Sequence, residues 1–330
     1  MIAQIDKHYV KTRPLKVWSR IISFGLFEGR PVTTRGKWIN PILFKLFKFY
    51  QLLPQLKKVN QPIFIIGTGR SGTTLLGKIL SIHREISFLN EPKALWHVIY
   101  DKEDIIGSYS DGEAFYFLNG KNAEEKQVVT AHKLYGAYLA FSGGKRALDK
   151  YPELIFRVQF VKKIFPNALF LFITRNGKNT LQSIKKWSEI HSENLPNEVH
   201  NWWGVNDRKW KLLCKQVIPD SKLLSNYYNE ITALTDHIDR AAVEWIVTME
   251  QGLQNMEECG NNILKIRYED LLSDKQTVLN EIFEFAHLEN DEKLFMYADQ
   301  VIHQPTVKND VTVKPFLKRP FDLMMEKLGY

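Results

Sequence analysis

The sequence predicts an α/β fold: a P-loop-like parallel sheet flanked by helices, preceded by a basic helical segment. Short apolar runs bounded by turn residues alternate with longer stretches of helical periodicity, the pattern of strands joined by helical crossovers. A glycine-rich turn directly follows the first of these runs. The chain has 330 residues, 44% of them hydrophobic and 12% aromatic, which is enough apolar material for a large core. This composition excludes disordered, collagen-like and coiled-coil proteins.

The positive charge is concentrated near the start of the chain. The formal net charge is +8, but residues 1–84 hold fifteen Lys and Arg against two acidic residues, while the remainder is net negative. No acidic residue occurs between Glu28 and Glu85. Such a charge distribution favours a polyanionic ligand or an anionic surface as partner.

We predict two parts, a basic amphipathic extension (residues 1–60) and an α/β domain (residues 61–330). Within the extension, residues 41–53 have helical spacing, and Lys45 and Lys48 share one face. An amphipathic helix more often covers its own core than docks on a membrane or a partner. Both uses therefore stay open at this stage.

The α/β domain shows three strand patterns, each next to a helical one. Every strand pattern is a short run rich in β-branched and aromatic residues, bounded by turn residues or by a helical pattern. The predicted strands are 62–66, 168–174 and 263–268, and the predicted helices begin at Leu75 or cover 178–187 and about 232–258.

Residues 67–74 form a turn suited to binding an anion. Glycines let the backbone wrap around an anion, and the first N–H groups of the following helix donate to it. Thr73 follows Gly72 where a nucleotide-triphosphatase loop has lysine. The strand that would supply a magnesium-binding aspartate ends instead in Arg175. The turn is therefore predicted to hold an anion without a metal ion.

These residues resemble the sulfotransferase family, which transfers a sulfuryl group from 3′-phosphoadenosine 5′-phosphosulfate (PAPS). Residues 62–76 are similar to the family's phosphosulfate loop, and Arg175 with Ser183 eight residues later is similar to its 3′-phosphate signature. Residues 268–271 (YEDL) resemble a late family stretch more weakly. The resemblance implies a PAPS site formed by Gly69, Arg70, Ser71, Gly72, Thr73, Thr74, Arg175 and Ser183.

The resemblance also implies catalytic roles for three residues. Glu91 lies where protein-tyrosine and carbohydrate sulfotransferases carry their general base. Lys150 resembles the lysine that contacts the bridging oxygen, and Arg70 would share the charge of the phosphosulfate. The stretch around Lys150 departs from the family pattern, because Tyr151 replaces threonine and Leu154 replaces asparagine.

Three other groups of residues leave alternatives open. A histidine is the base in the cytosolic branch of the family, and His97 is the fallback candidate here, ahead of His83 and His132. The cations near the C-terminus form either a loop over the cofactor or a solvated tail. The tryptophan cluster is either core packing or a platform for the acceptor. The last two groups are Lys314, Lys318 and Arg319, and Trp187, Trp202, Trp203 and Trp210.

The location of the protein is also predicted from the sequence. Two cysteines are too few for a disulfide framework, and no apolar run reaches the roughly 20 residues of a membrane span. We therefore expect a cytoplasmic protein in a reducing compartment, with peripheral contact with an anionic membrane as an open alternative.

The function predicted from the sequence is metal-independent, in-line sulfuryl transfer from PAPS to a hydroxyl acceptor. The acceptor would be a glycan, a lipid or a small metabolite, and the product nucleotide would be 3′,5′-ADP. The alternatives are a P-loop kinase or nucleotidase, and a non-catalytic protein that binds nucleic acid or an anionic membrane. Nucleic acid is not the expected partner, since the anion site accounts for part of the basic charge.

Overall fold

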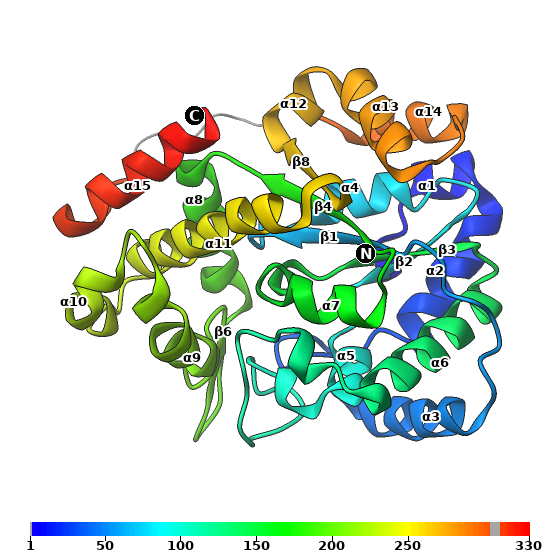
Figure 1. The fold of residues 1–330 in the computed structure, drawn as a ribbon, viewed down its shortest axis with the longest axis horizontal. Helices are drawn as coiled ribbons and strands as arrows, with labels where there is room; N and C mark the ends of the chain where they lie inside the picture. Colours follow the sequence, from blue (N-terminus) through cyan, green and yellow to red (C-terminus); the bar gives the residue numbers. More distant parts are fainter. Residues whose placement is uncertain (1, 304–310) are drawn as a thin grey trace.

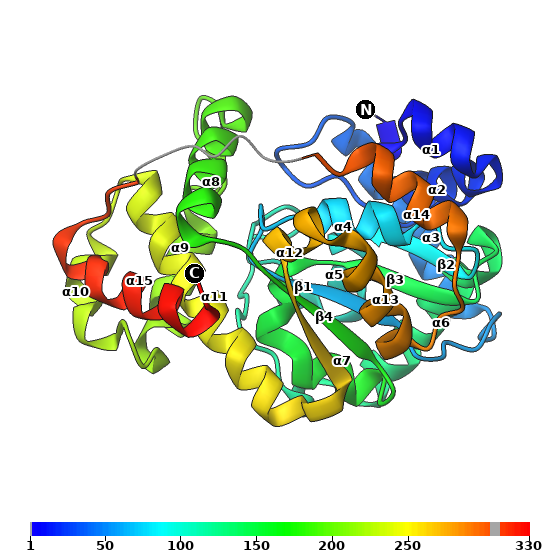
Figure 2. The same cartoon turned by 90° about the horizontal axis from the view of Figure 1, so that it is seen from above.

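The computed structural model describes residues 2–303 and 311–330, and its centre is a parallel sheet of five strands (Figure 1). The strand order is β2-β3-β1-β4-β8, and each neighbouring pair is parallel. Helices cover both faces of the sheet (Figures 1 and 2). The predicted α/β class is therefore confirmed. The strands are β1 (Ile63–Gly67), β2 (Ile86–Asn90), β3 (Arg146–Lys150), β4 (Leu169–Thr174) and β8 (Ile263–Arg267).

Successive side chains of the central strands pack alternately into two separate hydrophobic cores, one on each face of the sheet. All five residues of β1 are buried; Phe64 and Ile66 join one hydrophobic cluster, whereas Ile63 and Ile65 join the other. A strand buried on both faces has a continuous apolar run, which is why β1 and β4 were recognisable from the sequence. Strand β8, at the edge of the sheet, is only partly buried, and its short apolar run contains a lysine.

Strands β2 and β3 were not predicted. Three of the five residues of β3 are charged, yet all five are buried. The Arg146 guanidinium donates to the carbonyls of Gln61 and Ala286, and the Asp149 carboxylate accepts hydrogen bonds from Trp96 and Tyr135. Buried charges are tolerated when they are paired in this way, but a strand of this kind has no apolar signature.

The helices pack on the two faces and at one end of the sheet. In Figure 1, α12, α13 and α14 lie above the sheet and α5, α6 and α7 below it. No helix in the described part of the chain is long and apolar enough to cross a bilayer. The helices are α1 (Lys7–Thr12), α2 (Pro14–Leu26), α3 (Asn40–Leu52), α4 (Thr73–Leu80), α5 (Lys93–Ile99), α6 (Glu125–Ser142), α7 (Val158–Ile164), α8 (Gly177–His191), α9 (Arg208–Gln216), α10 (Tyr228–Thr232), α11 (His237–Cys259), α12 (Tyr268–Ser273), α13 (Lys275–Ala286), α14 (Glu292–Val301) and α15 (Pro315–Leu328).

The predicted helices of the α/β domain and of the extension are present. Helix α4 begins at the glycine-rich turn, α8 follows β4, and α11 covers most of the long helical pattern before β8. Helix α3 matches the predicted amphipathic helix, and its Leu43, Phe47 and Tyr50 are buried in the main core. The boundary at residue 60 stays a prediction.

The C-terminal cations lie on or next to a helix rather than in a loop. Lys318 and Arg319 belong to α15, which packs on α11, and the Lys314 backbone N–H donates to Asp239. A helix stands where a loop or a flexible tail was predicted, because an apolar face that includes Leu317 and Phe321 packs on the core while the three cationic side chains stay exposed.

A close approach of α11 to β4 gives a test of this packing. A Cβ at Gly252 would lie 2.1 Å from the ring of Phe172, which is fully buried. We expect Gly252→Ala to lower the free energy of unfolding by roughly 1–3 kcal/mol, since the core must shift to admit the methyl group. Urea unfolding measures the change.

Gly25→Ala is the matched control, because it also lies in a helix and a Cβ there meets nothing within 4 Å. This control should be neutral or stabilising by up to ~1 kcal/mol. Equal effects of the two substitutions would contradict the close packing.

Candidate functional site

The candidate site is built on the carboxyl ends of neighbouring parallel strands. Glu91 directly follows β2, Lys150 is the last residue of β3, the glycine-rich turn follows β1, and Arg175 follows β4. In the β2–β3 ladder Asn90 lies opposite Lys150, so both strands end at the same level. Parallel strands present their carboxyl ends at one edge, where open α/β sheets bind ligands.

The glycine-rich turn is held tightly against the sheet. The Ser71 hydroxyl donates to the Thr68 carbonyl at 2.6 Å. Gly72 has φ 95°, and a Cβ there would come within 2.2 Å of the Tyr268 ring. Glycine is needed at this position both for the backbone conformation and for the space. The turn thereby leads into α4, whose first residues Thr73 and Thr74 follow directly.

Arg70, Arg175 and Ser183 come together beside the turn. Arg70 Nε donates to Ser183 Oγ at 3.2 Å, and Arg175 Nη1 donates to the backbone carbonyl of Arg70 at 2.8 Å. Burial and the neighbouring Arg175 charge both lower the pKa of Arg70. Neither guanidinium is within 4.0 Å of a carboxylate among the described residues. Two adjacent cations without a carboxylate partner favour binding of a polyanion.

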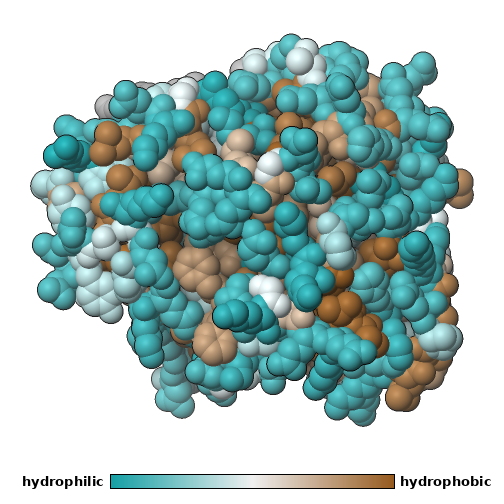
Figure 3. Space-filling model, viewed as in Figure 1, coloured by the Kyte–Doolittle hydropathy of each residue, from teal (hydrophilic) through white to brown (hydrophobic). Residues whose placement is uncertain are grey.

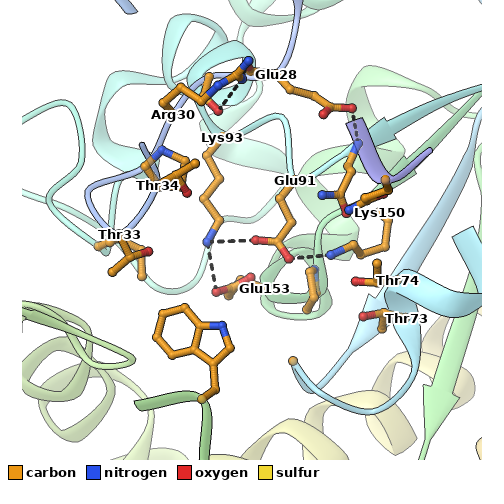
Figure 4. Close-up of a pocket in the computed structure, with 18 of the residues that line it drawn as sticks. Glu28, Arg30, Thr33, Thr34, Thr73, Thr74, Glu91, Lys93, Lys150 and Glu153 are labelled. Atoms are coloured by element: carbon orange, nitrogen blue, oxygen red, sulfur yellow. Dashed lines mark hydrogen bonds and ion pairs between the residues drawn. The ribbon is translucent and has the colours of Figure 1, made fainter. Parts of the chain in front are cut away.

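Glu91 lies between two lysines (Figure 4). Lys150 Nζ forms a short hydrogen bond to one carboxylate oxygen, and Lys93 Nζ lies 3.5 Å from the other. Burial raises the pKa of Glu91, but the two ammonium groups outweigh it and hold the pKa well below its usual range. The Glu91 side chain is 35% exposed, whereas that of Lys150 is 2% exposed. The carboxylate is thus ionised and reachable from the cavity.

The ion pairs continue behind Glu91 as a buried chain of alternating charges. Lys93 and Lys209 each lie 3.6 Å from the Glu153 carboxylate, and Lys209 also pairs with Glu244 at 2.5 Å. Sequence reasoning missed this chain. Lys93 could have been found by its position two residues after Glu91, but Lys209 and Glu244 come from α9 and α11 and carry no local signal.

A cavity of about 360 Å³ opens over these groups. The segment between α2 and α3 lines it with Arg30, Thr33 and Thr34, which face Lys93 in Figure 4. On another side Trp202 closes over the turn, since a Cβ at Gly69 would meet its ring at 2.5 Å. The cavity therefore offers hydroxyl, guanidinium and aromatic surface to a second ligand.

The cavity is lined by six of the residues predicted to bind PAPS or to act in catalysis. Ser71 and Gly72 belong to the turn but do not line the cavity. Arg175 and Ser183 also lie outside the lining, where they contact Arg70. Their predicted roles stay predictions. The six lining residues are Gly69, Arg70, Thr73, Thr74, Glu91 and Lys150.

The histidine alternatives lie outside the cavity lining, and only part of the tryptophan cluster lines it. His97 does not line the cavity and packs between Phe44 and Tyr109. The tryptophan cluster splits into two pairs: Trp187 and Trp202 line the cavity in an edge-on contact, while Trp203 and Trp210 are buried in the core. His83 and His132 each bond a backbone carbonyl.

A comparison with known protein families finds a match that covers slightly more than half of the chain. The model of a family described as "Sulfotransferase family" matches residues 62–233, which contain β1, the turn, β2, β3, β4 and α8. All the residues predicted for the site fall within this match.

Two curated relatives match parts of the chain. Nodulation protein NoeE of Sinorhizobium fredii is 27% identical over 37% of this chain and 30% of its own length. Protein-tyrosine sulfotransferase A of Caenorhabditis elegans is 22% identical over 77% of this chain and 58% of its own length. The chain thus spans less than three fifths of either relative.

Two solved structures share the fold. A sulfotransferase from Mycobacterium avium aligns over 87% of this chain and 83% of its own, with a TM-score of 0.50 and 13% identity. The sulfotransferase domain of the Synechococcus olefin synthase aligns over 84% and 97%, with a TM-score of 0.50 and 17% identity.

The lowered pKa of Glu91 predicts a pH-dependent stability. A carboxylate whose pKa falls on folding stabilises the protein above its unfolded pKa of about 4.3, and this contribution is lost as the pH falls toward the folded value. We expect Glu91→Gln to lower the melting temperature at pH 7, and the difference from the unsubstituted protein to shrink below about pH 4.3.

Glu292→Gln, at an exposed position on α14, is the control. It should leave the melting temperature nearly unchanged at both pH values. A difference for Glu91→Gln that persists undiminished in acid would contradict the ion pairs assigned to this carboxylate.

Proposed function

The chain belongs to the sulfotransferase family, and we propose that it transfers a sulfuryl group from PAPS to a hydroxyl of an acceptor bound in the cavity. The observation that carries this proposal is the meeting of a glycine-rich turn, two arginines without a carboxylate partner among the described residues, and a lysine-held carboxylate at one edge of the sheet. The in-line reaction we propose uses no metal ion.

The residues around the turn fit a ligand with two anionic ends. Residues 69–74 would hold the phosphosulfate, and Arg175 with Ser183 would hold the 3′-phosphate. Arg175 Nε and Thr68 Oγ1 are buried polar atoms without a hydrogen-bond partner among the described residues. Buried polar atoms are usually paired, so both atoms favour a ligand at this place. Bound PAPS would supply the activated sulfuryl group.

Glu91 would act as the general base. Its carboxylate is ionised, faces the cavity and can accept the proton of an acceptor hydroxyl. The two lysines that keep it ionised also make it a weak base. Lys150, which is the better buried of the two and lies next to the turn, would offset negative charge that develops on a leaving group. Any anion that draws Lys150 away would raise the pKa of Glu91 and strengthen the base.

The acceptor would enter from the side formed by the N-terminal segment. Thr33, Thr34 and Arg30 supply polar contacts, and Trp187 and Trp202 supply flat apolar ones. This mixture is compatible with each acceptor class predicted above, a glycan, a lipid or a small metabolite.

Cofactor binding is testable by thermal shift. We expect PAPS and 3′,5′-ADP to raise the melting temperature without Mg²⁺, by a stabilisation of ~2.7 kcal/mol at a hundredfold excess over Kd. Arg175→Ala should weaken this binding strongly, because it removes the cation next to Arg70.

Arg267→Ala is the matched control, since Arg267 ends the neighbouring strand β8 but donates to the Gly329 carbonyl and lies over the Tyr330 ring rather than beside Arg70. Its response to 3′,5′-ADP should equal that of the unsubstituted protein. A shift produced by ATP only with Mg²⁺, and none by 3′,5′-ADP, would favour a kinase and contradict the proposal.

The role of Glu91 is testable by single-turnover transfer. We expect Glu91→Gln to retain 3′,5′-ADP affinity and to lower the single-turnover rate constant roughly 10²–10⁴-fold, because the glutamine cannot accept the proton.

Glu85→Gln serves as control, since Glu85 pairs with Lys145 before β2 and does not line the cavity. This control should keep full activity. Full activity of Glu91→Gln would remove Glu91 as the base and return the role to a histidine.

A further inference from the structure

Helix α2 packs against the protein with its polar side. Lys16, Ser19, Arg20 and Ser23 are all buried. Lys16 donates to the Ile86 carbonyl, Arg20 pairs with Glu28 at 2.7 Å, and the Ser23 and Tyr138 hydroxyls are 2.9 Å apart. Burial lowers the pKa of Lys16 to about 8. An amphipathic helix normally buries its apolar residues most deeply, whereas the most deeply buried residues of α2 are these four polar ones.

A row of apolar side chains on α2 faces outward, whereas Val17, Ile22 and Leu26 of the same helix pack against the core. Leu15 is 88% exposed, Trp18 63% and Ile21 47%. Their spacing of three residues places them on one side of the helix. We call these three residues the α2 stripe. Single exposed apolar residues are ordinary, but a row that includes a tryptophan marks an interaction surface.

Helix α3 adds a second exposed apolar row, and this row contains cations. Ile42, Phe49 and Leu52 are 55%, 53% and 82% exposed, and the exposed Lys45 and Lys48 lie between them on the same helix. Neither lysine forms an ion pair with a carboxylate in the part of the chain that the structure describes. The row is thus apolar and positively charged together.

The two rows lie in the same region of the molecule. Both views draw α1, α2 and α3 at one end, opposite α15 (Figures 1 and 2). Figure 3 shows hydrophobic surface at the lower right, over the region of α3 and α6. Phe141 of α6, 43% exposed, contacts Tyr50 of α3 and extends this apolar surface.

The acidic residues of the first 60 positions do not offset this positive charge. Asp6 is paired with Lys78, and Glu28 is buried with Arg20. Six exposed Lys and Arg residues of this segment form no ion pair with a carboxylate in the part of the chain that the structure describes. They are Lys7, Lys11, Arg35, Lys45, Lys48 and Lys58.

We propose that the α2 stripe and the exposed row of α3 dock this protein on the surface of an anionic lipid bilayer. Apolar side chains would enter the boundary between headgroups and acyl chains, while the lysines contact anionic headgroups. A second copy of the chain fits this face less well. In a symmetric contact the same patch meets itself, so Lys45 and Lys48 would approach their own counterparts. An anionic headgroup neutralises them instead.

Vesicle sedimentation of the full chain tests the proposal. The probes are vesicles of phosphatidylcholine alone and of phosphatidylcholine mixed with phosphatidylglycerol. We expect sedimentation with the anionic vesicles, weakened by high salt, and little with the neutral ones. Lys45→Glu with Lys48→Glu should lower the partition coefficient roughly tenfold or more. The triple variant Leu15→Ser, Trp18→Ser and Ile21→Ser should lower it comparably.

Lys318→Glu with Leu323→Ser is the matched control, since both side chains are exposed on α15 at the opposite end of the molecule. This control should bind like the unsubstituted protein, and all variants should keep their melting temperature and 3′,5′-ADP response. Absence of binding to anionic vesicles would overturn the proposal. Concentration-dependent dimerisation that the triple variant abolishes would also overturn it and make the face a protein interface.

Discussion

The in-register parallel pairing of β2 with β3 is the constraint on which the site depends. Because Asn90 lies opposite Lys150, the residue after β2 meets the last residue of β3, and the Glu91 N–H donates to the Lys150 carbonyl at 2.7 Å. Slipping the register would part Glu91 from Lys150. Strands β1 and β4 end at the same edge, so the turn and Arg175 are presented beside this pair.

Paired charge organises the interior around that edge. From Lys150 through Glu91, Lys93 and Glu153 to Lys209, cations and carboxylates alternate, so each of these two carboxylates pairs with two ammonium groups. Such a chain keeps groups ionised that would otherwise neutralise on burial. Arg70 and Arg175, beside the turn, differ from this chain because they have no carboxylate partner among the described residues. The lysines of the chain are neutralised by carboxylates, whereas the two arginines form a positively charged surface suited to an anion.

The positive charge of the N-terminal segment has several physical roles. Arg20 forms a buried ion pair with Glu28. Arg30 lines the cavity, and its guanidinium lies 3.7 Å from the centre of the Phe24 ring. Lys45 and Lys48 are exposed to solvent. Net charge alone could not distinguish these roles, because each depends on which side of a helix meets the sheet.

The sequence by itself determined the α/β class, three of the five strands of the described central sheet and the position of the glycine-rich turn, because apolar runs and glycine spacing are local signals. It also indicated Glu91, Lys150 and the Arg175–Ser183 pair through family resemblance. Only the tertiary structure decided that β3 is a buried strand and that Lys93 and Lys209 share Glu153. It also decided that α2 buries a polar row and exposes the α2 stripe. Periodicity shows that a helix has two faces, but which face is buried depends on the polar partners that the rest of the fold provides.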